Sequence, residues 1–480
     1  MKANAVGEAP VKVTLRNGGY DETEYLAAIS AGVHSAYTVD NAYVVITSAD
    51  GTVKGPINDA AAETLKAAKT AAETAVKQAV ATKLKMSVAD LENASPEVQA
   101  MVAAMVQSVR NAKSMSALAA ALGVPADTQI SVDSSTGALT LKDAEDKTVT
   151  LNPDGIKTED ENGNTVETIK PSDVAPVDTI TEALVDGKLT KDVNLASTAT
   201  ISEATVIDMN GHTITGPESG NVFTVSSGSL TLTNGKISVA ERQNGIALGG
   251  TGAVVNLTDV DISVDSNTSG RALYVSPVGG EKLNIKGGSF SVAGQTSALH
   301  VNGTNTLPVE ITIDGAEFTS TYATICPIYL AGVNKTTISN TTINGDVGIE
   351  IRNGSLTIED GTVINCTNST AVEFGPNGNG GTIDSGAGIV VSPHTPATVN
   401  LSVKVNAVTI NNADRPIWLV NFQNVAGRTG LVQIAKTVDV PVTVNQVTKA
   451  EAGAGVWTAE ENAAGNYNRY NFSQAAAPQA

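Results

Sequence analysis

Aromatic and acidic side chains recur at wide intervals in the second half of this 480-residue chain. Those whose types could do chemistry are Tyr274, His300, Tyr329, Glu350, Glu373 and Trp418. Aromatic rings can stack on the apolar faces of sugars or pack into a protein interface. Two carboxylates could instead form a retaining glycosidase pair if the fold held them about 5–5.5 Å apart. Which chemistry applies depends on the elements that position these residues.

A repeated strand motif predicts how these residues are placed. Two apolar residues flank one polar residue, a short bend follows, and a further apolar residue comes next, as in Leu230–Ile237 and Val255–Ile262. The second apolar position recurs at steps of 20 to 28 residues. That spacing is typical of one coil of a β-solenoid. The residues in this position are Met209, Leu232, Leu257, Ile285, Ile313, Ile338 and Ile358.

A second strand recurs between these motifs. Its aliphatic pairs are Phe223/Val225, Ile246/Leu248, Leu273/Val275, Leu299/Val301, Ile328/Leu330, Ile349/Ile351 and Val372/Phe374, with Ile417/Leu419 in a later coil. Successive residues of a strand face opposite ways, so each pair is expected to point into the solenoid and the residue between it outward. The outward residues are Thr224, Ala247, Tyr274, His300, Tyr329, Glu350, Glu373 and Trp418. All six candidates therefore share one predicted column, which is a surface ladder, a binding stripe for sugar or protein, or a hydrolytic site.

The bend of each motif carries only glycine, asparagine or aspartate. The positions are Gly211, Asn234, Asp259, Gly287, Gly315, Asn340 and Asp360. These residue types tolerate the left-handed backbone that a sharp bend between strands requires. We therefore interpret Asp259 and Asp360 as turn formers and not as acidic site residues.

The repeat region resembles the pectate-lyase-like β-helix proteins. Thr190–Leu195, Ala199–Ile201 and Ile207–Ile214 are similar to their opening coils, and Thr179–Leu184 is similar to their N-terminal capping helix. The resemblance implies a mostly β fold with a right-handed parallel β-helix over residues 176–450 and a C-terminal cap and tail over 451–480. The family includes polysaccharide lyases, glycosidases, bacterial adhesins and phage tailspikes, so it implies no single activity. The calcium-binding aspartate cluster of such lyases has no counterpart in this sequence.

The first 175 residues divide into three parts. Residues 1–55 predict a small β-rich anchoring domain, because apolar and polar residues alternate there. Residues 56–123 predict an α-helical segment, and residues 124–175 predict a β-hairpin or linker.

The helical segment carries an alanine-rich apolar stripe formed by Leu65, Ala68, Ala72, Val76, Val80 and Leu84. Ser87–Asp90 has the pattern of a capping box, and Ser95 followed by Pro96 has the pattern of a helix start. The stripe packs either in a local cluster of helices or as a coiled-coil-like contact between subunits.

Composition narrows the function classes. The formal net charge of −19 argues against a nucleic-acid partner, which requires a basic surface. No apolar run is long enough to insert into a membrane, and the N-terminus lacks the apolar run of a signal peptide. Cys326 and Cys366 are the only cysteines, and we interpret both as buried small apolar side chains. With four scattered histidines, the sequence predicts no metal site and no cofactor.

The order of the parts leads to a functional hypothesis. A small N-terminal domain, a helical section and a distal β-helix, without an export signal, resemble the arrangement of phage fibre, spike and head-decoration proteins. We expect a non-enzymatic virion surface protein, made in the host cytoplasm and assembled as a homo-oligomer such as a trimer. Residues 1–122 would bind other capsid or tail proteins, and the β-helix would contact the host or a host-surface glycan. The alternatives are a polysaccharide-degrading tailspike-like enzyme and an extracellular bacterial surface adhesin.

Overall fold

The chain forms two compact units, residues 1–176 and 177–480. The computed structural model describes side chains over residues 63–239, 243–264, 270–302, 307–322, 325–367, 386–393, 399–420, 428–444, 456–460 and 465–473. Backbone alone is described for 11–17, 22–27, 42–47, 53–54, 59–62, 421, 445–446, 455 and 474. Each unit is described by itself below.

The first unit begins with a four-stranded antiparallel sheet. Its strands are β1 (Val11–Asn17), β2 (Glu22–Ala27), β3 (Ala42–Thr47) and β4 (Val53–Lys54), in the order β2-β1-β3-β4. Helices follow, at α1 (Asp59–Lys83), η1 (Asp90–Asn93), α2 (Pro96–Asn111) and α3 (Met115–Ala121). The unit ends with the hairpin β5 (Gln129–Val132) and β6 (Leu139–Lys142), and with η2 (Pro153–Gly155) and α4 (Pro171–Val174).

The helices of the first unit share one apolar core. All six residues of the predicted alanine-rich stripe are buried in it, beside Met101 and Met105 of α2. Leu141 and Ile156 are buried in the same core, so the segment predicted as a hairpin or linker packs against the helices. Lys69 is also buried, and its Nζ donates hydrogen bonds to the carbonyl oxygens of Arg110 and Ala112 at the end of α2. A cation at this position complements the carbonyl groups that a helix leaves unpaired at its C-terminus.

The predicted helix starts differ in outcome. Ser95 caps α2, because its side chain accepts a hydrogen bond from the Val98 backbone, and Pro96 follows as the first helical residue. Ser87 and Asp90 do form reciprocal bonds, with Ser87 Oγ and Asp90 Oδ2 2.6 Å apart. The element that they start is the single 3₁₀ turn η1 and not an α-helix.

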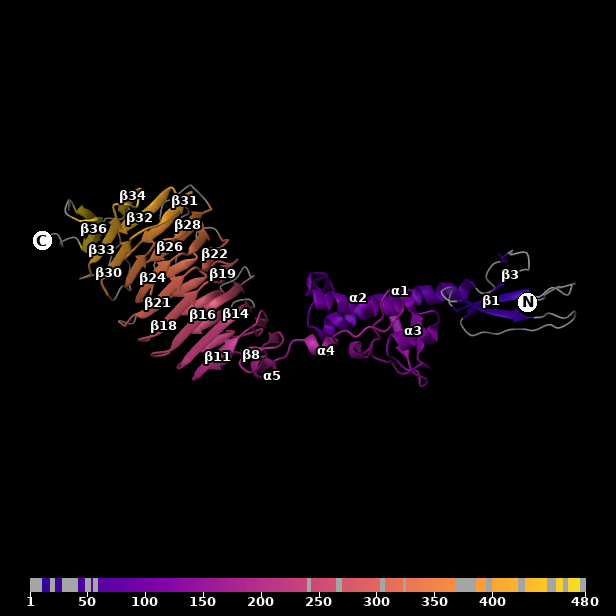
Figure 1. Ribbon diagram of the computed structural model, residues 1–480. Coiled ribbons are helices and arrows are strands. Elements are labelled where there is room, and N and C mark those ends of the chain that lie inside the picture. The colour runs from indigo at the N-terminus through magenta and orange to yellow at the C-terminus, as the bar shows by residue number, and fades with distance from the viewer. Residues whose placement is uncertain are drawn as a thin grey trace. The chain divides into compact units, whose positions relative to one another are not determined.

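The second unit is a parallel β-solenoid (Figure 1). Each turn contributes one strand to a ten-stranded sheet and one or two strands to a larger sheet that bends at the corner of each coil. The helix α5 (Ile180–Ala183) lies at its N-terminal end, where the Thr179 side chain accepts a hydrogen bond from the Glu182 backbone. Coil thus stacks on coil with strands about 4.8 Å apart, and each coil contacts its neighbours.

The ten-stranded sheet holds the predicted second strand of every coil. Its members, in spatial order, are β10 (Ala199–Ile201), β13 (Phe223–Val225), β15 (Asn244–Leu248), β17 (Arg271–Val275), β20 (Leu299–Val301), β23 (Ile328–Leu330), β26 (Val347–Ile351), β29 (Ala387–Val391), β32 (Arg415–Asn421) and β34 (Val442–Gln446). We call it the ten-stranded sheet throughout.

The larger sheet holds the remaining strands. They are β7 (Leu184–Val185), β8 (Lys188–Leu189), β9 (Val193–Asn194), β11 (Ala204–Asp208), β12 (Thr213–Thr215), β14 (Ser229–Val239), β16 (Val254–Val264), β18 (Lys282–Lys286), β19 (Ser289–Val292), β21 (Val309–Asp314), β22 (Glu317–Ser320), β24 (Asn334–Ser339), β25 (Thr342–Gly345), β27 (Ser355–Ile358), β28 (Val363–Cys366), β30 (Leu401–Val405), β31 (Thr409–Asn411), β33 (Gly430–Ala435), β35 (Gly455–Glu460) and β36 (Tyr467–Gln474).

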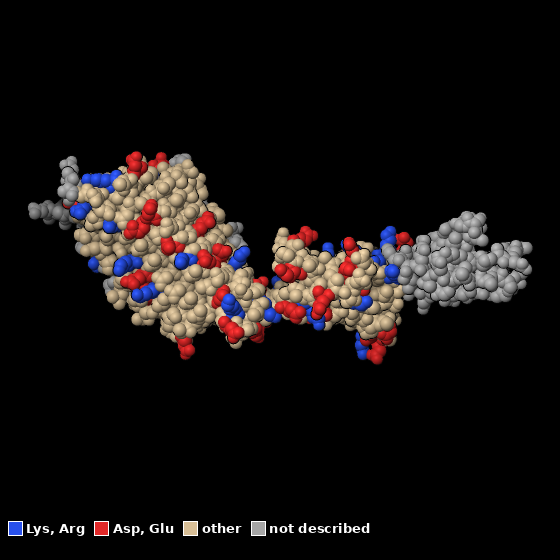
Figure 2. All heavy atoms as spheres, viewed as in Figure 1, with Lys and Arg blue, Asp and Glu red and all other residues tan. Residues whose placement is uncertain are grey.

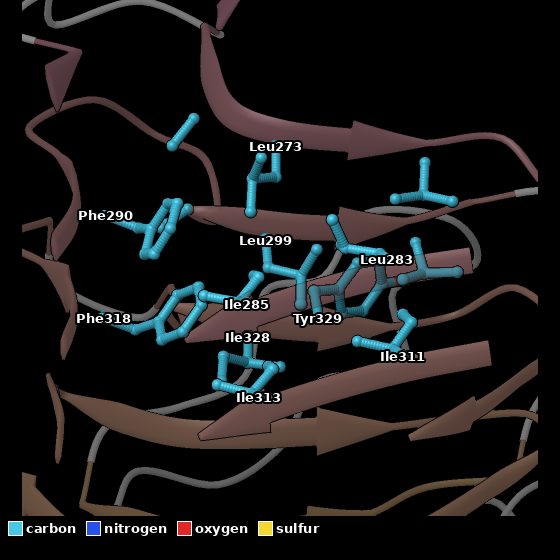
Figure 3. Packing of buried hydrophobic residues seen from close by; sticks show 14 of the residues in the cluster. Leu273, Leu283, Ile285, Phe290, Leu299, Ile311, Ile313, Phe318, Ile328 and Tyr329 are labelled. Carbon is cyan, nitrogen blue, oxygen red and sulfur yellow. The ribbon is translucent and has the colours of Figure 1, made fainter. Parts of the chain in front are cut away.

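The inward residues form aliphatic columns along the solenoid, as predicted. Leu257, Ile285, Ile313, Ile338 and Ile358 follow one another in strict register. In another column Phe290 and Phe318 stack, with ring centroids 4.8 Å apart (Figure 3). Buried apolar side chains from all walls therefore meet in one continuous core, and burial of this surface is the main stabilising term.

Two predicted assignments are wrong in detail. Ile207, and not Met209, stands in register with Leu232, because the first corner is longer and both Asn210 and Gly211 adopt positive φ there. After β26, the pair that continues the column is Ile389/Val391 and not Val372/Phe374, which lie outside the described residues.

The corner residues adopt the backbone that their types predict. Positive φ occurs at Gly211, Asn234, Asp259, Gly287, Gly315 and Asn340, at six of the seven predicted positions. At the seventh, the left-handed residue is Gly361, whose backbone N–H donates to the Asp360 side chain. Asp259, with a φ of 52°, is thus a corner residue.

An antiparallel hairpin closes the C-terminal end. Strand β36 pairs antiparallel with β33 and with β35, whereas the neighbouring coils are parallel. Trp457 and Phe472 are buried under it with ring centroids 5.1 Å apart, and Trp457 Nε1 donates to the Val420 carbonyl at 3.1 Å. Reversal of direction gives the last parallel coil a partner on its open edge.

Candidate functional site

The middle outward position of the ten-stranded sheet forms one column across the solenoid, which we call the aromatic column. In register, its residues are Thr224, Ala247, Tyr274, His300, Tyr329, Glu350, Val390, Trp418 and Thr443. The structure therefore brings together Tyr274, His300, Tyr329 and Glu350, and places Trp418 two strands beyond Glu350. Val390 occupies the position predicted for Glu373, which lies outside the described residues.

Three of the rings lie against one another. The centroids of Tyr274 and His300 are 5.8 Å apart, and those of His300 and Tyr329 are 4.8 Å apart. Both pairs are tilted, at 37° and 57°, an arrangement that brings ring edges near ring faces. The three rings thus pack in one row over three adjacent strands.

Three arginines flank the column, each against one ring. The Cζ atoms of Arg271, Arg352 and Arg415 lie 5.1, 5.2 and 4.2 Å from the ring centroids of Tyr274, Tyr329 and Trp418, respectively. A guanidinium over an aromatic face is held by the ring quadrupole. The column therefore combines aromatic rings with local positive charge in a chain whose net charge is −19.

A buried charge pair lies in the middle of the column. Arg352 Nε donates to Glu350 Oε1 at 2.5 Å, and Ser392 Oγ donates to the same oxygen at 2.8 Å. Arg352 is 3% exposed and Glu350 is 0% exposed. Burial alone would lower the pKa of Arg352, but the charge of Glu350 raises that pKa above its ordinary value. Within the described part of the chain, Glu350 Oε2 and Arg352 Nη2 find no hydrogen-bond partner, so the pair is only partly satisfied.

His300 is held in its neutral form. Burial, followed by the charges of Arg271 and Arg352, lowers its pKa from 6.5 to about 3. Desolvation and nearby cations both disfavour an imidazolium. His300 therefore contributes a neutral ring to the column at physiological pH.

The column divides into two halves by exposure. Tyr274 and His300 are half-buried, whereas Tyr329, Glu350 and Trp418 are only 4%, 0% and 2% exposed. The accessible part is therefore the end that Arg271, Tyr274 and His300 form, which we call the open half. Tyr329, Glu350, Val390 and Trp418 are buried within the unit.

This geometry bears on the hydrolytic hypothesis. The Glu350 carboxylate is buried and bonded to Arg352, and its neighbour along the column is the aliphatic Val390. A retaining pair requires two carboxyl groups that reach the same sugar. Because Glu373 lies outside the described residues, that pairing stays a prediction.

The other candidate residues occupy structural positions. Cys326 and Cys366 are free and buried, and burial raises the pKa of both thiols. His212 lies 3.3 Å from the Asp192 carboxylate at a corner. Among the described residues, no group of three or more His, Cys, Asp and Glu side chains could hold a metal ion, and no helix is long and apolar enough to cross a membrane.

A hollow of about 500 Å³ lies on another wall of the solenoid. Its lining includes Asp360, Val363, Thr409, Asp439 and Val440, and no residue of the aromatic column. It lies beside the short strand β31. This hollow and the aromatic column are therefore separate places on the solenoid. We take the aromatic column as the candidate site because its side chains can contact a ligand through rings and charges.

Sequence reasoning missed the residues that surround the rings. Arg271 and Arg415 each precede a column residue by three positions, and Arg352 follows Glu350 by two. That spacing was visible, because charged residues make up only 16% of the chain. Ser392 gave no signal, since its contact with Glu350 depends on how a later coil is placed.

Comparisons with known proteins found no matching family model, no similar curated protein and no matching solved structure. The assignment of a function therefore rests on the residues of this chain.

Proposed function

We propose that this chain is a non-enzymatic surface protein of a phage virion, such as a head fibre, a decoration protein or a tail fibre. In this proposal the first unit binds other virion proteins, and a right-handed β-helix presents the aromatic column to a host-surface glycan. The observation that carries the proposal is that outward-facing rings and flanking arginines gather in one column of the ten-stranded sheet. Rings and guanidinium groups are characteristic of contact surfaces.

The uncharged areas on the surface of the solenoid are consistent with this proposal. Charged side chains are scattered over the visible surface and leave wide uncharged areas between them (Figure 2). A column of Ser, Thr and Asn runs along the larger sheet, from Ser238 to Asn411, without a charge. The aromatic column differs from this uncharged column in carrying rings and flanking arginines.

Immunogold electron microscopy tests the location. Antibodies raised against the purified chain would be applied to particles and to cell envelopes from the source of the sequence. We expect gold on the particle surface, and labelling that is lost when residues 1–122 are removed. Labelling of envelopes alone would favour the adhesin, and incorporation that does not depend on residues 1–122 would contradict the proposed anchor.

A reducing-end assay separates the enzyme alternative. The full chain would be incubated with host-surface polysaccharide, beside its Glu350→Gln and Glu373→Gln variants. We expect no release of reducing ends by any of the three proteins. Release that both substitutions abolish would overturn the non-enzymatic assignment.

A further inference from the structure

We propose that the edge of β31, together with the hollow beside it, binds an extended basic peptide that adds a strand to the larger sheet. This edge lies on a different wall of the solenoid from the aromatic column. Peptide binding here therefore goes beyond the proposed function and does not depend on it. Four properties support it: an unpaired strand edge, half-buried apolar side chains, a hydroxyl group without a partner, and two carboxylates.

The larger sheet has an unpaired edge at β31. The strands β19, β22, β25 and β28 each have a parallel neighbour on both sides, whereas β31 pairs with β28 and with no other strand of the described residues. The Thr409 N–H donates to the Thr362 carbonyl on the β28 side, so the backbone groups of the next residue, Ile410, face the open side. In the described part of the chain, no backbone group beyond this edge bonds to Ile410. Such an edge is a template for a further strand.

The hollow beside this edge leaves open an apolar position that earlier coils bury. Ile410 stands in register with Ile364, which is 0% exposed, yet Ile410 is only half-buried. Val438 and Val440, from the next coil, line the same hollow of about 500 Å³ and are also half-buried. Ligand-binding pockets commonly measure about 300–1,000 Å³. A strand placed on β31 would cover these side chains, and burial of their apolar surface favours association.

A buried hydroxyl group in the lining needs a polar partner. Thr362 lines the hollow and is 1% exposed, and its Oγ1 has no hydrogen-bond partner among the described residues. In the preceding coil, the equivalent Thr341 Oγ1 donates to the Ser339 carbonyl at 2.7 Å. A buried polar atom without a partner is costly. A backbone group of a peptide in the hollow would give Thr362 the partner that Thr341 already has.

The charge of the hollow selects a basic peptide. Among the described residues, its lining contains the exposed carboxylates of Asp360 and Asp439 and no lysine or arginine. Side chains of an added strand alternate between the two faces of the sheet, so its apolar residues can face the hollow while a lysine or arginine meets these carboxylates. A second copy of this chain is a poorer occupant, because its net charge of −19 makes two copies repel each other.

The probe is the blocked peptide acetyl-Thr-Val-Lys-Val-Lys-Val-Thr-amide, labelled with an uncharged dye. One matched control carries glutamate in place of both lysines. The other keeps every side chain but is methylated on the three central backbone nitrogens, which removes their hydrogen-bond donors. Binding to the full chain would be measured by fluorescence anisotropy. We expect each control to bind at least tenfold more weakly, since two backbone hydrogen bonds or one charge-assisted bond correspond to about this factor.

Substitutions then locate the site. The double variant Asp360→Asn/Asp439→Asn should weaken binding of the lysine peptide by about tenfold, because each exposed ion pair contributes about threefold. Glu317→Gln is the matched control, since it removes a carboxylate from the same outward column, three strands before Thr409. That distance is about 14 Å at 4.8 Å per strand, beyond the screening length of about 8 Å in 0.15 M salt. Affinity should stay within about twofold in this control. Fluorescence of Trp418 and Trp457, the only tryptophans, verifies that each variant is folded.

Hydrogen exchange followed by mass spectrometry locates the peptide without any substitution. Bound lysine peptide should slow exchange in the fragment that contains Ile410 and leave the fragment that contains β19 unchanged. Equal affinity for the methylated peptide would exclude strand addition, and equal affinity for the glutamate peptide would exclude selection by charge. Absence of binding at millimolar peptide, or protection of the ten-stranded sheet instead of β31, would overturn the inference. Immunogold labelling of particles is measured separately, so these failures would leave the proposed function standing.

Discussion

Two outward columns of the same solenoid differ in where their polar side chains find hydrogen-bond partners. On the larger sheet, Ser238, Ser263, Ser291, Thr319, Asn344, Asn365 and Asn411 stand in register and carry no charge. Asn411 Nδ2 donates to Asn365 Oδ1 at 2.8 Å, and Asn365 Nδ2 donates to Asn344 Oδ1 at 2.9 Å. We call this the amide column. Asn365 thus bonds to both of its neighbours in the column, although Asn344 Nδ2 also donates to Glu317 Oε1, which lies outside the column, at 2.7 Å.

The difference shows what a stack of identical coils permits. An amide is both donor and acceptor, so a column of amides satisfies itself by repetition. A carboxylate such as Glu350 cannot do this, and it is stabilised only because Arg352 and Ser392 come from beside the column. An amide in such a column can therefore bond to its neighbours along the stack, whereas the buried Glu350 depends on Arg352 and Ser392.

The largest expected effect comes from breaking the buried pair. Arg352→Met leaves Glu350 charged, buried and without its cation, and should lower the free energy of unfolding by about 3–5 kcal/mol. Denaturant unfolding followed by tryptophan fluorescence measures this in the solenoid alone, because both tryptophans lie there. The double variant Glu350→Met/Arg352→Met should recover most of the loss. A single variant as stable as the parent would show that the pair carries no such role.

The second largest effect is expected on acidification, which should lower the free energy of unfolding through His300. The folded-state pKa of His300, about 3, lies below its unfolded value near 6.5. Between those values the unfolded chain binds a proton that the folded chain does not, so stability falls as pH falls through this window. The slope is up to about 1.4 kcal/mol per pH unit. The difference in unfolding free energy between the parent chain and His300→Phe, measured from pH 6.5 to 5, isolates this contribution; parallel curves would contradict it.

The amide column should respond less. Asn365→Ala removes one hydrogen bond to Asn344 and one from Asn411, each worth about 0.5–1.5 kcal/mol. We expect a loss of about 1–2 kcal/mol, since both neighbours are partly open to water and can bond to it. Asn411→Ala, at the exposed end of the same column, is the matched control and should cost less. An Asn365→Ala loss as large as that of Arg352→Met would erase the contrast between the columns.

The smallest effect is expected at a corner. Asp259 has a φ of 52°, so Asp259→Ala should cost about 1 kcal/mol, whereas Asp259→Gly should be close to neutral. Both variants remove the carboxylate, and only the backbone preference differs. An equal loss of stability in both variants would contradict the corner role of Asp259.

Local rules predicted the walls and corners of the solenoid well. Alternation placed Leu273 and Val275 inward and Tyr274 outward, and left-handed tolerance placed Asn234 and Asn340 at corners. These features depend on single strands and turns, which a short window of sequence contains. The same alternation of inward and outward residues recurs in every coil. A wrong strand assignment in one coil therefore leaves the assignments in the other coils unchanged.

The sequence prediction failed where the length of one coil differs from that of the others. A long segment separates β28 from β29, and a periodic alignment places Phe374 where the structure has Val391. The burial of Tyr329 and Trp418 could not be predicted from sequence either. The alternation of residues along a strand predicts which way these side chains face, but not what packs over them. The arginines that complete the site belong to neighbouring positions whose direction depends on packing.

The C-terminal hairpin has a consequence for size. Parallel coils are interchangeable units that each advance the stack by about 4.8 Å, and nothing within a coil determines how many there are. Because β36 pairs antiparallel with β33 and is itself paired with β35, the edge of β33 that would receive another parallel coil is occupied. The two ends of the solenoid are capped separately from the coils between them. Duplication or deletion of whole coils would therefore change the length of the solenoid without a change in either cap.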